Sequence, residues 1–154
     1  MTALRKFPAV LTETSYLFPS FVACMGSGLA KVVTGQVSFF LDTGSQKTIL
    51  GENDCLKMGI DIGQLPMSPR PLAGWGGTAE AHVINNMIIL MRDETGKNKE
   101  IPIENILVAS LHDKKKKGGN FRPLPSVLGW DFLLKGYHFH CDPVRKEVYL
   151  GEWS

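Results

Sequence analysis

The chain has 154 residues, of which 44% are hydrophobic and 21% charged, and its formal net charge is +2. This balance is ordinary for a folded protein, so it excludes a largely disordered chain, and the length suits one domain. Four positive charges stand together in Lys114–Lys117, so the basic character is local and predicts no nucleic-acid-binding surface. We interpret this lysine run as a solvated loop, with a contact to an acidic partner as the alternative.

Residues 1–30 are predicted to form an N-terminal arm or extra strands ahead of a domain over 31–154. Seventeen uncharged residues separate Glu13 from Lys31, but proline, glycine and hydroxyl residues interrupt them. They are too few and too polar for a membrane-spanning helix. Glu13 also breaks the apolar core that a secretory signal needs. The sequence "FVAC", residues 21–24, is only faintly similar to a lipoprotein cleavage site, so we expect no membrane partner.

Three cysteines, Cys24, Cys55 and Cys141, lie far apart in the sequence and are odd in number. They form no CxxC pair and no disulfide framework. We therefore expect reduced thiols in a cytoplasmic protein.

The chain after residue 30 alternates short apolar stretches with turns, and it contains 16 Gly and 9 Pro. "KVVTGQVSFFLD" predicts two strand pieces around Gly35-Gln36. Further strands are predicted over 81–91 and 101–109, and a last hairpin around Asp142-Pro143. The segment 91–123 is predicted to hold a hairpin followed by a loop. Many short strands between turns predict an all-β barrel or sandwich.

Helical signals are weak and confined to two places. Residues 51–59, "GENDCLKMG", predict one or two helical turns that end at Gly59, and 129–136, "GWDFLLKG", predict two turns between glycines. In no part of the sequence do apolar residues recur with the 3.6-residue period of an amphipathic helix.

The stretch "SFFLDTGSQKTIL", residues 38–50, ends a run typical of a buried strand with a carboxylate, Asp42. We expect the strand to place this side chain in a dry setting, where ionisation is costly. Thr43 offers a hydroxyl to a neighbouring loop, and Ser45 adds a second donor. Gly44 permits a tight turn whose N–H can approach the carboxylate. Alone, Asp-Thr-Gly also fits an aspartate that bonds to its own turn.

Two such carboxylates facing each other would share one proton, because like charges a few ångströms apart do not both ionise easily. One could then activate water as a base while the other acts as an acid. The chain has one Asp-Thr-Gly, so two copies require a two-fold symmetric homodimer.

Two further motifs follow in order. "PLAGWGGTAEAHVI", residues 71–84, contains Gly74, Trp75, Gly76 and Gly77 ahead of a strand. It fits a plain hairpin loop or a hinged flap that closes over a substrate. "VLGWDFL", residues 127–133, runs from a short apolar strand through Gly129 into a predicted helix.

With these three motifs in this order, the sequence resembles the retropepsin-like aspartic proteases, in particular their cellular, single-motif members. The resemblance covers roughly residues 32–150 and includes the final "YHFHCDP…VYL". It implies an all-β, closed retropepsin-like barrel with one short C-terminal helix, assembled as a homodimer. It implies hydrolysis of peptide bonds in a peptide or protein substrate by activated water, with no metal, no cofactor and no covalent intermediate.

The resemblance also implies a role for each motif residue. Asp42 would be catalytic, Thr43 would bond across the dimer axis, and Gly44 and Ser45 would shape the turn. Gly74, Trp75, Gly76 and Gly77 would form the flap over the peptide. In the last motif, Leu128, Gly129 and Asp131 would be structural, with Gly129 close behind the active-site loop.

The chain departs from the viral members in two places. The segment between the flap and the last motif is longer, and residues 1–30 precede the core. The viral dimers are held largely by interleaved terminal strands, so the mode of dimerisation is open here.

Three other interpretations remain open. "HFHCD" would place His138, His140 and Asp142 on one face of a strand, with Cys141 on the other, which suggests a metal site or an edge strand with a polar face. The chain could be a non-catalytic dimerisation or peptide-binding module. A phosphoryl-transfer role for Asp42 would want a second carboxylate two residues on, where Gly44 stands.

Overall fold

The computed structural model describes residues 3–74, 77–110 and 124–154. Most of the described residues lie in strands, so the fold is mostly β, which agrees with the predicted all-β class at this coarser level. The helical elements in the described residues are short: α1 (Glu52–Lys57), the 3₁₀ turn η1 (Ile62–Gln64) and α2 (Trp130–Leu133). The lysine run, Trp75 and Gly76 lie outside the described residues. No helix in the described ranges is both long and apolar enough to cross a membrane.

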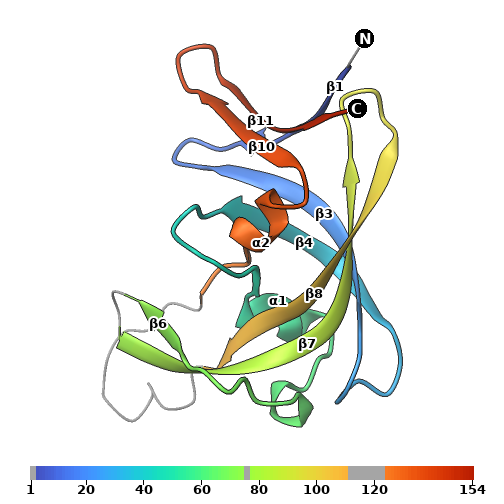
Figure 1. Ribbon diagram of the computed structural model, residues 1–154, viewed down its shortest axis with the longest axis vertical. Coiled ribbons are helices and arrows are strands. Elements are labelled where there is room, and N and C mark those ends of the chain that lie inside the picture. The colour runs from blue at the N-terminus through green and yellow to red at the C-terminus, as the bar shows by residue number, and fades with distance from the viewer. Residues whose placement is uncertain (1–2, 75–76, 111–123) are drawn as a thin grey trace.

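The larger sheet contains the strand β4, which leads directly into Asp42 (Figure 1). Its strands pair in the order β2 (Val10–Leu11), β3 (Tyr16–Met25), β4 (Val33–Leu41), β9 (Val127–Leu128), β5 (Ile49–Leu50), β8 (Asn98–Ser110), β7 (Gly77–Arg92) and β6 (Leu72–Gly74). β3 also pairs with β7, so the pairings that run from β3 through β4, β9, β5, β8 and β7 return to β3. The shape of a closed retropepsin-like barrel and the homodimer remain predictions.

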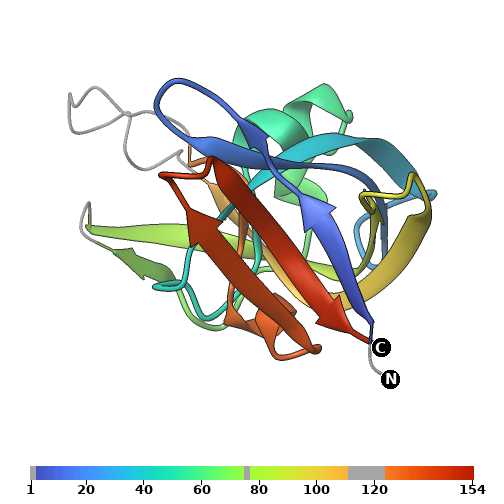
Figure 2. The ribbon, with the colours of Figure 1, turned by 90° about the horizontal axis from the view of Figure 1, so that it is seen from above.

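The smaller sheet brings the two ends of the chain together (Figure 2). β11 (Glu147–Trp153) lies between β1 (Leu4–Pro8) and β10 (Tyr137–Asp142), and both pairings are antiparallel. The β10–β11 turn confirms the predicted final hairpin. Residues 1–30 were expected to be an arm or extra strands, and residues 4–25 contribute β1, β2 and β3.

Most of the core lies inside the larger sheet, because every second side chain of its strands points inward. The smaller sheet adds Phe7, Tyr137, Val148 and Leu150 to the same cluster. On β4, Val37, Phe39 and Leu41 are buried while the residues between them are more exposed. β7 and β8 confirm the predicted strands over 81–91 and 101–109, and the turn between them confirms the predicted hairpin. α1 is followed by Gly59 with φ +77°, as expected for the end of a helix.

Two sequence predictions about local structure were wrong. β4 is one continuous strand, and Gly35 lies in its interior because the side chain of Met58 occupies the space that a Cβ would need. α2 has four helical residues in place of two turns. Lys135 and Gly136 bond back only three residues, and Gly136 has φ +107°, so the helix ends early.

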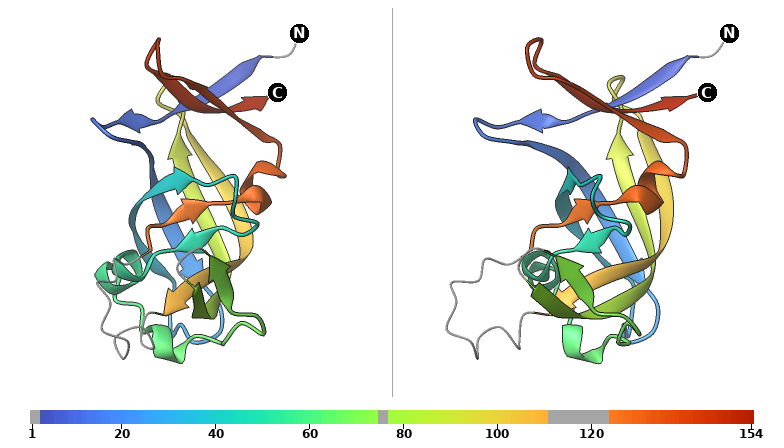
Figure 3. Two further views of the ribbon diagram at one scale, coloured as in Figure 1. Left: turned by 90° about the vertical axis from the view of Figure 1, so that its left-hand side faces the viewer. Right: turned by 60° about the vertical axis from the view of Figure 1, so that its left-hand side comes forward.

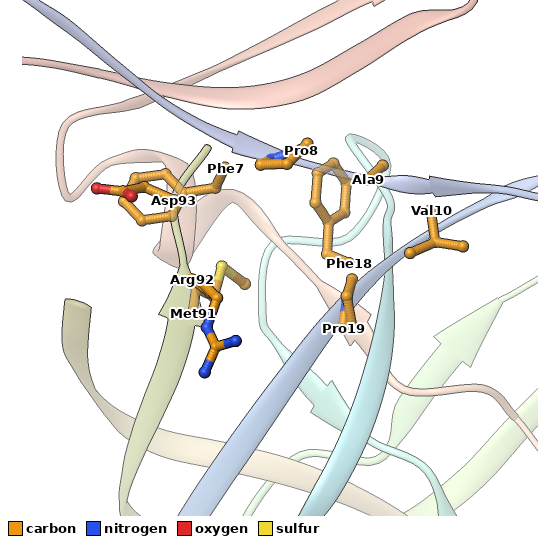
Figure 4. A pocket seen from close by; sticks show the side chains of 9 residues that line it. All are labelled: Phe7, Pro8, Ala9, Val10, Phe18, Pro19, Met91, Arg92 and Asp93. Carbon is orange, nitrogen blue, oxygen red and sulfur yellow. The ribbon is translucent and has the colours of Figure 1, made fainter. Parts of the chain in front are cut away.

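A cavity of about 240 Å³ opens between the two sheets, near the start of β3 and the end of β7 (Figure 4). Pairing of β3 with β7 begins only at Phe21, and Pro19 has no N–H to extend it. The apolar lining includes Phe7, Phe18 and Met91. None of the predicted site residues lines this cavity.

An ion pair anchors β1 to the turn between β7 and β8. Arg5 Nε donates to Asp93 Oδ2 at 2.7 Å, while Asp93 Oδ1 accepts from the hydroxyl of Thr95 at 2.7 Å and the backbone N–H of Lys97 at 2.9 Å. The Thr95 hydroxyl is the largest influence and lowers the pKa of Asp93. Burial opposes it, and Arg5 and the backbone N–H groups add to the lowering, which leaves the pKa well below its usual range.

This lowered pKa predicts how stability depends on pH. The stabilisation is complete above the ordinary pKa of aspartate, about 3.9, and is lost as pH falls below it toward the folded value. We expect Asp93→Asn to melt at a lower temperature than the parent at neutral pH, and the difference to shrink between about pH 4 and about pH 2. The exposed neighbour variant Glu94→Gln should show no such trend. A difference that is constant with pH would contradict the role of the Asp93 charge.

Candidate active site

Asp42 stands at the point where β4 leaves the sheet. β4 runs parallel to β9, with Leu41 opposite Leu128. The N–H of Asp42 donates to the carbonyl of Leu128 at 3.0 Å, so the backbone of Asp42 is still held by the neighbouring strand. The buried side chains of Phe39 and Leu41 fix the direction of the strand up to this residue.

The carboxylate of Asp42 is held by its own turn. The N–H of Gly44 donates to Asp42 Oδ1 at 2.9 Å, and the N–H of Ser45 donates to the carbonyl of Asp42 at 3.1 Å. A Cβ at Gly44 would lie 3.1 Å from Asp42 Oδ1, which is tight. The hydroxyl of Ser45 donates to the carbonyl of Lys47 at 2.6 Å, so it braces the loop and does not point its proton at the carboxylate.

The expected dry setting of Asp42 was wrong for the single chain. Asp42, Thr43 and Gly44 are all exposed, because the chain has already left the buried strand where the turn begins. Within the described residues, Asp42 takes part in no salt bridge, and the hydroxyl of Thr43 has no hydrogen-bond partner there. The turn therefore presents a fixed carboxylate and a free hydroxyl to the outside.

The last motif lies directly behind this loop. The N–H groups of Trp130 and Asp131 donate to the carbonyls of Ser45 at 2.9 Å and Gln46 at 3.2 Å. A Cβ at Gly129 would lie 2.6 Å from the carbonyl carbon and oxygen of Lys47. Only glycine therefore permits this backbone approach.

Trp130 adds a side-chain contact to the same loop. Its indole Nε1–H donates to the carbonyl of Thr43 at 2.6 Å, although the side chain remains exposed. Leu128 is fully buried beneath the loop. The loop that carries Asp42 is thus fixed by backbone and side-chain bonds from one short segment.

Thr48 is a supporting residue that the sequence analysis missed. It is fully buried, and its hydroxyl donates to Asp131 Oδ1 at 2.8 Å while accepting the N–H of Gly129 at 3.2 Å. Asp131 Oδ1 also accepts the N–H of Phe132 at 2.9 Å, within the first turn of α2. The other oxygen of Asp131 is buried without a partner among the described residues.

Tyr16 of β3 is a second neighbour that the sequence did not reveal. Its hydroxyl donates to the carbonyl of Leu41 at 3.4 Å. Burial raises the pKa of Tyr16, and the nearby charges of Cys141 and Asp42 raise it further. Its ring also packs against Phe139 of β10, with ring centroids 5.4 Å apart, so Tyr16 contacts both the end of β4 and β10.

The predicted flap residues fall on a hairpin. β6 and β7 pair antiparallel with Gly74 opposite Gly77, and Trp75 and Gly76 lie outside the described part. The β6–β7 hairpin and the loop that follows β4 project toward the same side of the molecule in Figures 1 and 2. A hairpin in this place matches both earlier interpretations, a plain loop and a flap.

The structure resembles that of a retropepsin-like aspartic protease from Rickettsia conorii. The match covers 100% of this chain and 96% of the other, with 19% sequence identity and a TM-score of 0.48. No family model and no curated protein matches the sequence. At this distance the resemblance transfers no role to an individual residue.

The histidine pattern on β10 is explained by stacking. His138 stacks on Trp153 with ring centroids 6.0 Å apart, and His140 stacks on Tyr149 at 4.6 Å. Within the described ranges, no group of three or more His, Cys, Asp or Glu side chains is arranged to hold a metal ion. The edge strand with a polar face accounts for the pattern.

Proposed function

We propose that the chain is an aspartic-type endopeptidase that acts as a homodimer, with Asp42 of two copies forming the catalytic pair. The observation that carries this proposal is the Asp42 turn itself. A carboxylate at the end of a buried strand is held by the N–H of Gly44, braced from behind by the segment 129–131, and exposed to a partner.

The chemistry follows from bringing two such carboxylates together. They would share one proton, so one is ionised and the other is an acid. The ionised carboxylate takes a proton from water as the water oxygen attacks the carbonyl carbon of the peptide bond. The acid protonates the carbonyl oxygen, which gives a tetrahedral diol. The carbon–nitrogen bond then breaks as the amine takes the proton that the first carboxylate received from water, and one hydroxyl of the diol returns its proton to the other carboxylate. This sequence requires no metal and no cofactor.

The remaining motif residues support the pair. The exposed hydroxyl of Thr43, without a partner in the described part of its own chain, is free to bond to the loop of a second copy. The hairpin over Gly74–Gly77 covers the bound peptide, and Gly129 and Asp131 keep the loop in position. The thiols of Cys24, Cys55 and Cys141 are free, and we place the enzyme in the cytoplasm, where thiols stay reduced.

A dilution series tests the proposal with the unmodified protein. Cleavage of a peptide library should be inhibited by pepstatin, and the rate per chain should fall as dilution converts dimer to monomer, because a monomer holds one Asp42. Sedimentation velocity over the same concentrations gives the dimer fraction. A rate per chain that stays constant while the dimer dissociates would rule out a shared pair.

A further inference from the structure

The smaller sheet leaves two edges for a partner. β11 lies in the middle and pairs with β1 from Leu4 to Pro8 and with β10 from Tyr137 to Asp142. Both terminal strands are therefore paired within their own chain (Figure 3). A second copy that joins this sheet has only the outer edge of β1 or the outer edge of β10.

The two edges differ in their protection against pairing. β1 carries Lys6, and it ends at Pro8, which has no N–H to donate. Lysine and proline are devices that keep sheet edges from pairing with another chain. β10, with the sequence YHFHCD, contains neither. Among the described residues, the outer edge of β10 carries neither of these devices and has no strand paired to it.

The β10 strand also lies beside Asp42. Phe139 of β10 packs against Tyr16, with ring centroids 5.4 Å apart, and the Tyr16 hydroxyl bonds to the carbonyl of Leu41. One tyrosine thus separates β10 from the residue before Asp42. We take β10 as the edge of contact because it lies one side chain away from the strand end that carries Asp42.

Symmetry and side-chain faces restrict the register. His138 and His140 stack on β11 side chains of the outer face, whereas Tyr137 and Phe139 pack inward against Phe132 and Tyr16. Two β10 strands related by a two-fold axis run antiparallel, and directly opposed side chains share a face. In a symmetric pairing of this kind, one residue of β10 therefore lies on the two-fold axis, directly opposite the same residue of the second copy.

Hydrogen-bond complementarity distinguishes the two central residues of β10, Phe139 and His140. Centred on Phe139, the pairing places His138 opposite His140 and leaves Asp142 beyond the strand. Centred on His140, it places His138 opposite Asp142 twice by symmetry. That pairs an imidazole N–H donor with a carboxylate acceptor, and opposite partners of this kind stabilise neighbouring strands.

We propose that β10 pairs antiparallel with β10 of a second copy, centred on His140, so that the two three-stranded sheets join into one of six strands. The proposal rests on the proposed pairing of Asp42 and identifies the surface that holds it. This β10 interface takes the place of the interleaved terminal strands of the viral dimers, because the terminal strands β1 and β11 of this chain already pair with each other.

A cysteine cross-link tests the register. His140→Cys in a Cys141→Ser background would place two thiols directly opposite, at a Cβ separation of about 5 Å, close to the span of a disulfide. We expect most of the protein to form a covalent dimer under mild oxidation. The matched control, Lys6→Cys in the same background, lies on β1 and should stay monomeric on a denaturing gel. Equal cross-linking of the control, or none of the β10 variant, would overturn the proposal.

Hydrogen exchange of the unmodified protein gives an independent test that does not depend on a variant folding. The amides of 137–142 should exchange more slowly at concentrations where the dimer forms, whereas those of 4–8 should not change. Added protection of 4–8 alone, or of neither segment, would overturn the proposal. Pepstatin-sensitive cleavage without added protection or cross-linking of β10 would support the protease proposal and overturn the β10 interface. A β10 cross-link in a protein that cleaves no peptide would support the interface and overturn the protease proposal.

Discussion

Substitution of Asp42 by asparagine is expected to abolish peptide cleavage while leaving the fold and the dimer intact. Asparagine keeps the size of the side chain and the oxygen that accepts the Gly44 N–H, but it neither takes a proton from water nor shares one with a second carboxylate. General acid–base groups contribute about 10²–10⁴-fold to rates. Because this change removes both members of the pair in a homodimer, we expect kcat/KM for a cleaved peptide to fall by about 10⁴-fold or more.

Asp61→Asn is the matched control for this experiment. Asp61 Oδ1 accepts the N–H of Gly63 at 3.1 Å, the same turn geometry that Asp42 makes with Gly44. This exposed residue is the N-cap of η1 and belongs to none of the three motifs of the predicted site. Its variant should cleave as the parent does. If Asp42→Asn cleaves as fast as Asp61→Asn, the protease proposal is wrong. A parent chain that dimerises and binds peptide but never cleaves would establish the non-catalytic module instead.

A shared proton also gives the reaction a characteristic pH dependence. The parent rate should follow a bell with its optimum at acidic to near-neutral pH, since the pair must hold one proton and not two or none. Any residual cleavage by Asp42→Asn should lose this shape. A parent rate that rises steadily into the alkaline range is incompatible with the pair.

The sequence predicted most strands because their alternation is strong, and it failed where a distant contact decides the local structure. Gly35 is a reasonable place to divide a strand, yet Met58, which is remote in sequence, packs over it and the strand continues. Likewise, nothing in "QKTIL" marks Thr48. Its hydroxyl matters because Gly129 and Asp131, about eighty positions away in sequence, fold against it.

The position of Asp42 at a strand end was predictable, whereas its surroundings were not. The run of Phe39, Phe40 and Leu41 specifies a strand and two inward side chains. It says nothing about the turn that follows, where Asp42 emerges into solvent. The described residues of one chain do not supply the dry setting that the sequence suggests, and the residues of the strand alone could not reveal this.

Gly129→Ala is expected to damage stability and activity together, because Gly129 is where two backbones come closest behind the site. The new Cβ would lie 2.6 Å from the carbonyl of Lys47 and 2.8 Å from that of Ser45. Both neighbours are backbone atoms, so the loop must move. Overpacking of this kind costs about 1–3 kcal/mol, which thermal unfolding would measure as a lower melting temperature.

The loss of activity should exceed what the loss of stability explains. The loop that Gly129→Ala displaces ends in the Asp42 turn, and the N–H of Trp130 holds it through the carbonyl of Ser45. A displacement of about 1 Å in a catalytic group can reduce a rate by about 10². We therefore expect kcat to fall at temperatures where the variant is fully folded. Gly63→Ala is the control, since a Cβ there would meet only Asp61 Oδ1 at an ordinary 3.4 Å. Equal stability and equal kcat for the two variants would show that the close approach of Gly129 does not hold the Asp42 loop in place.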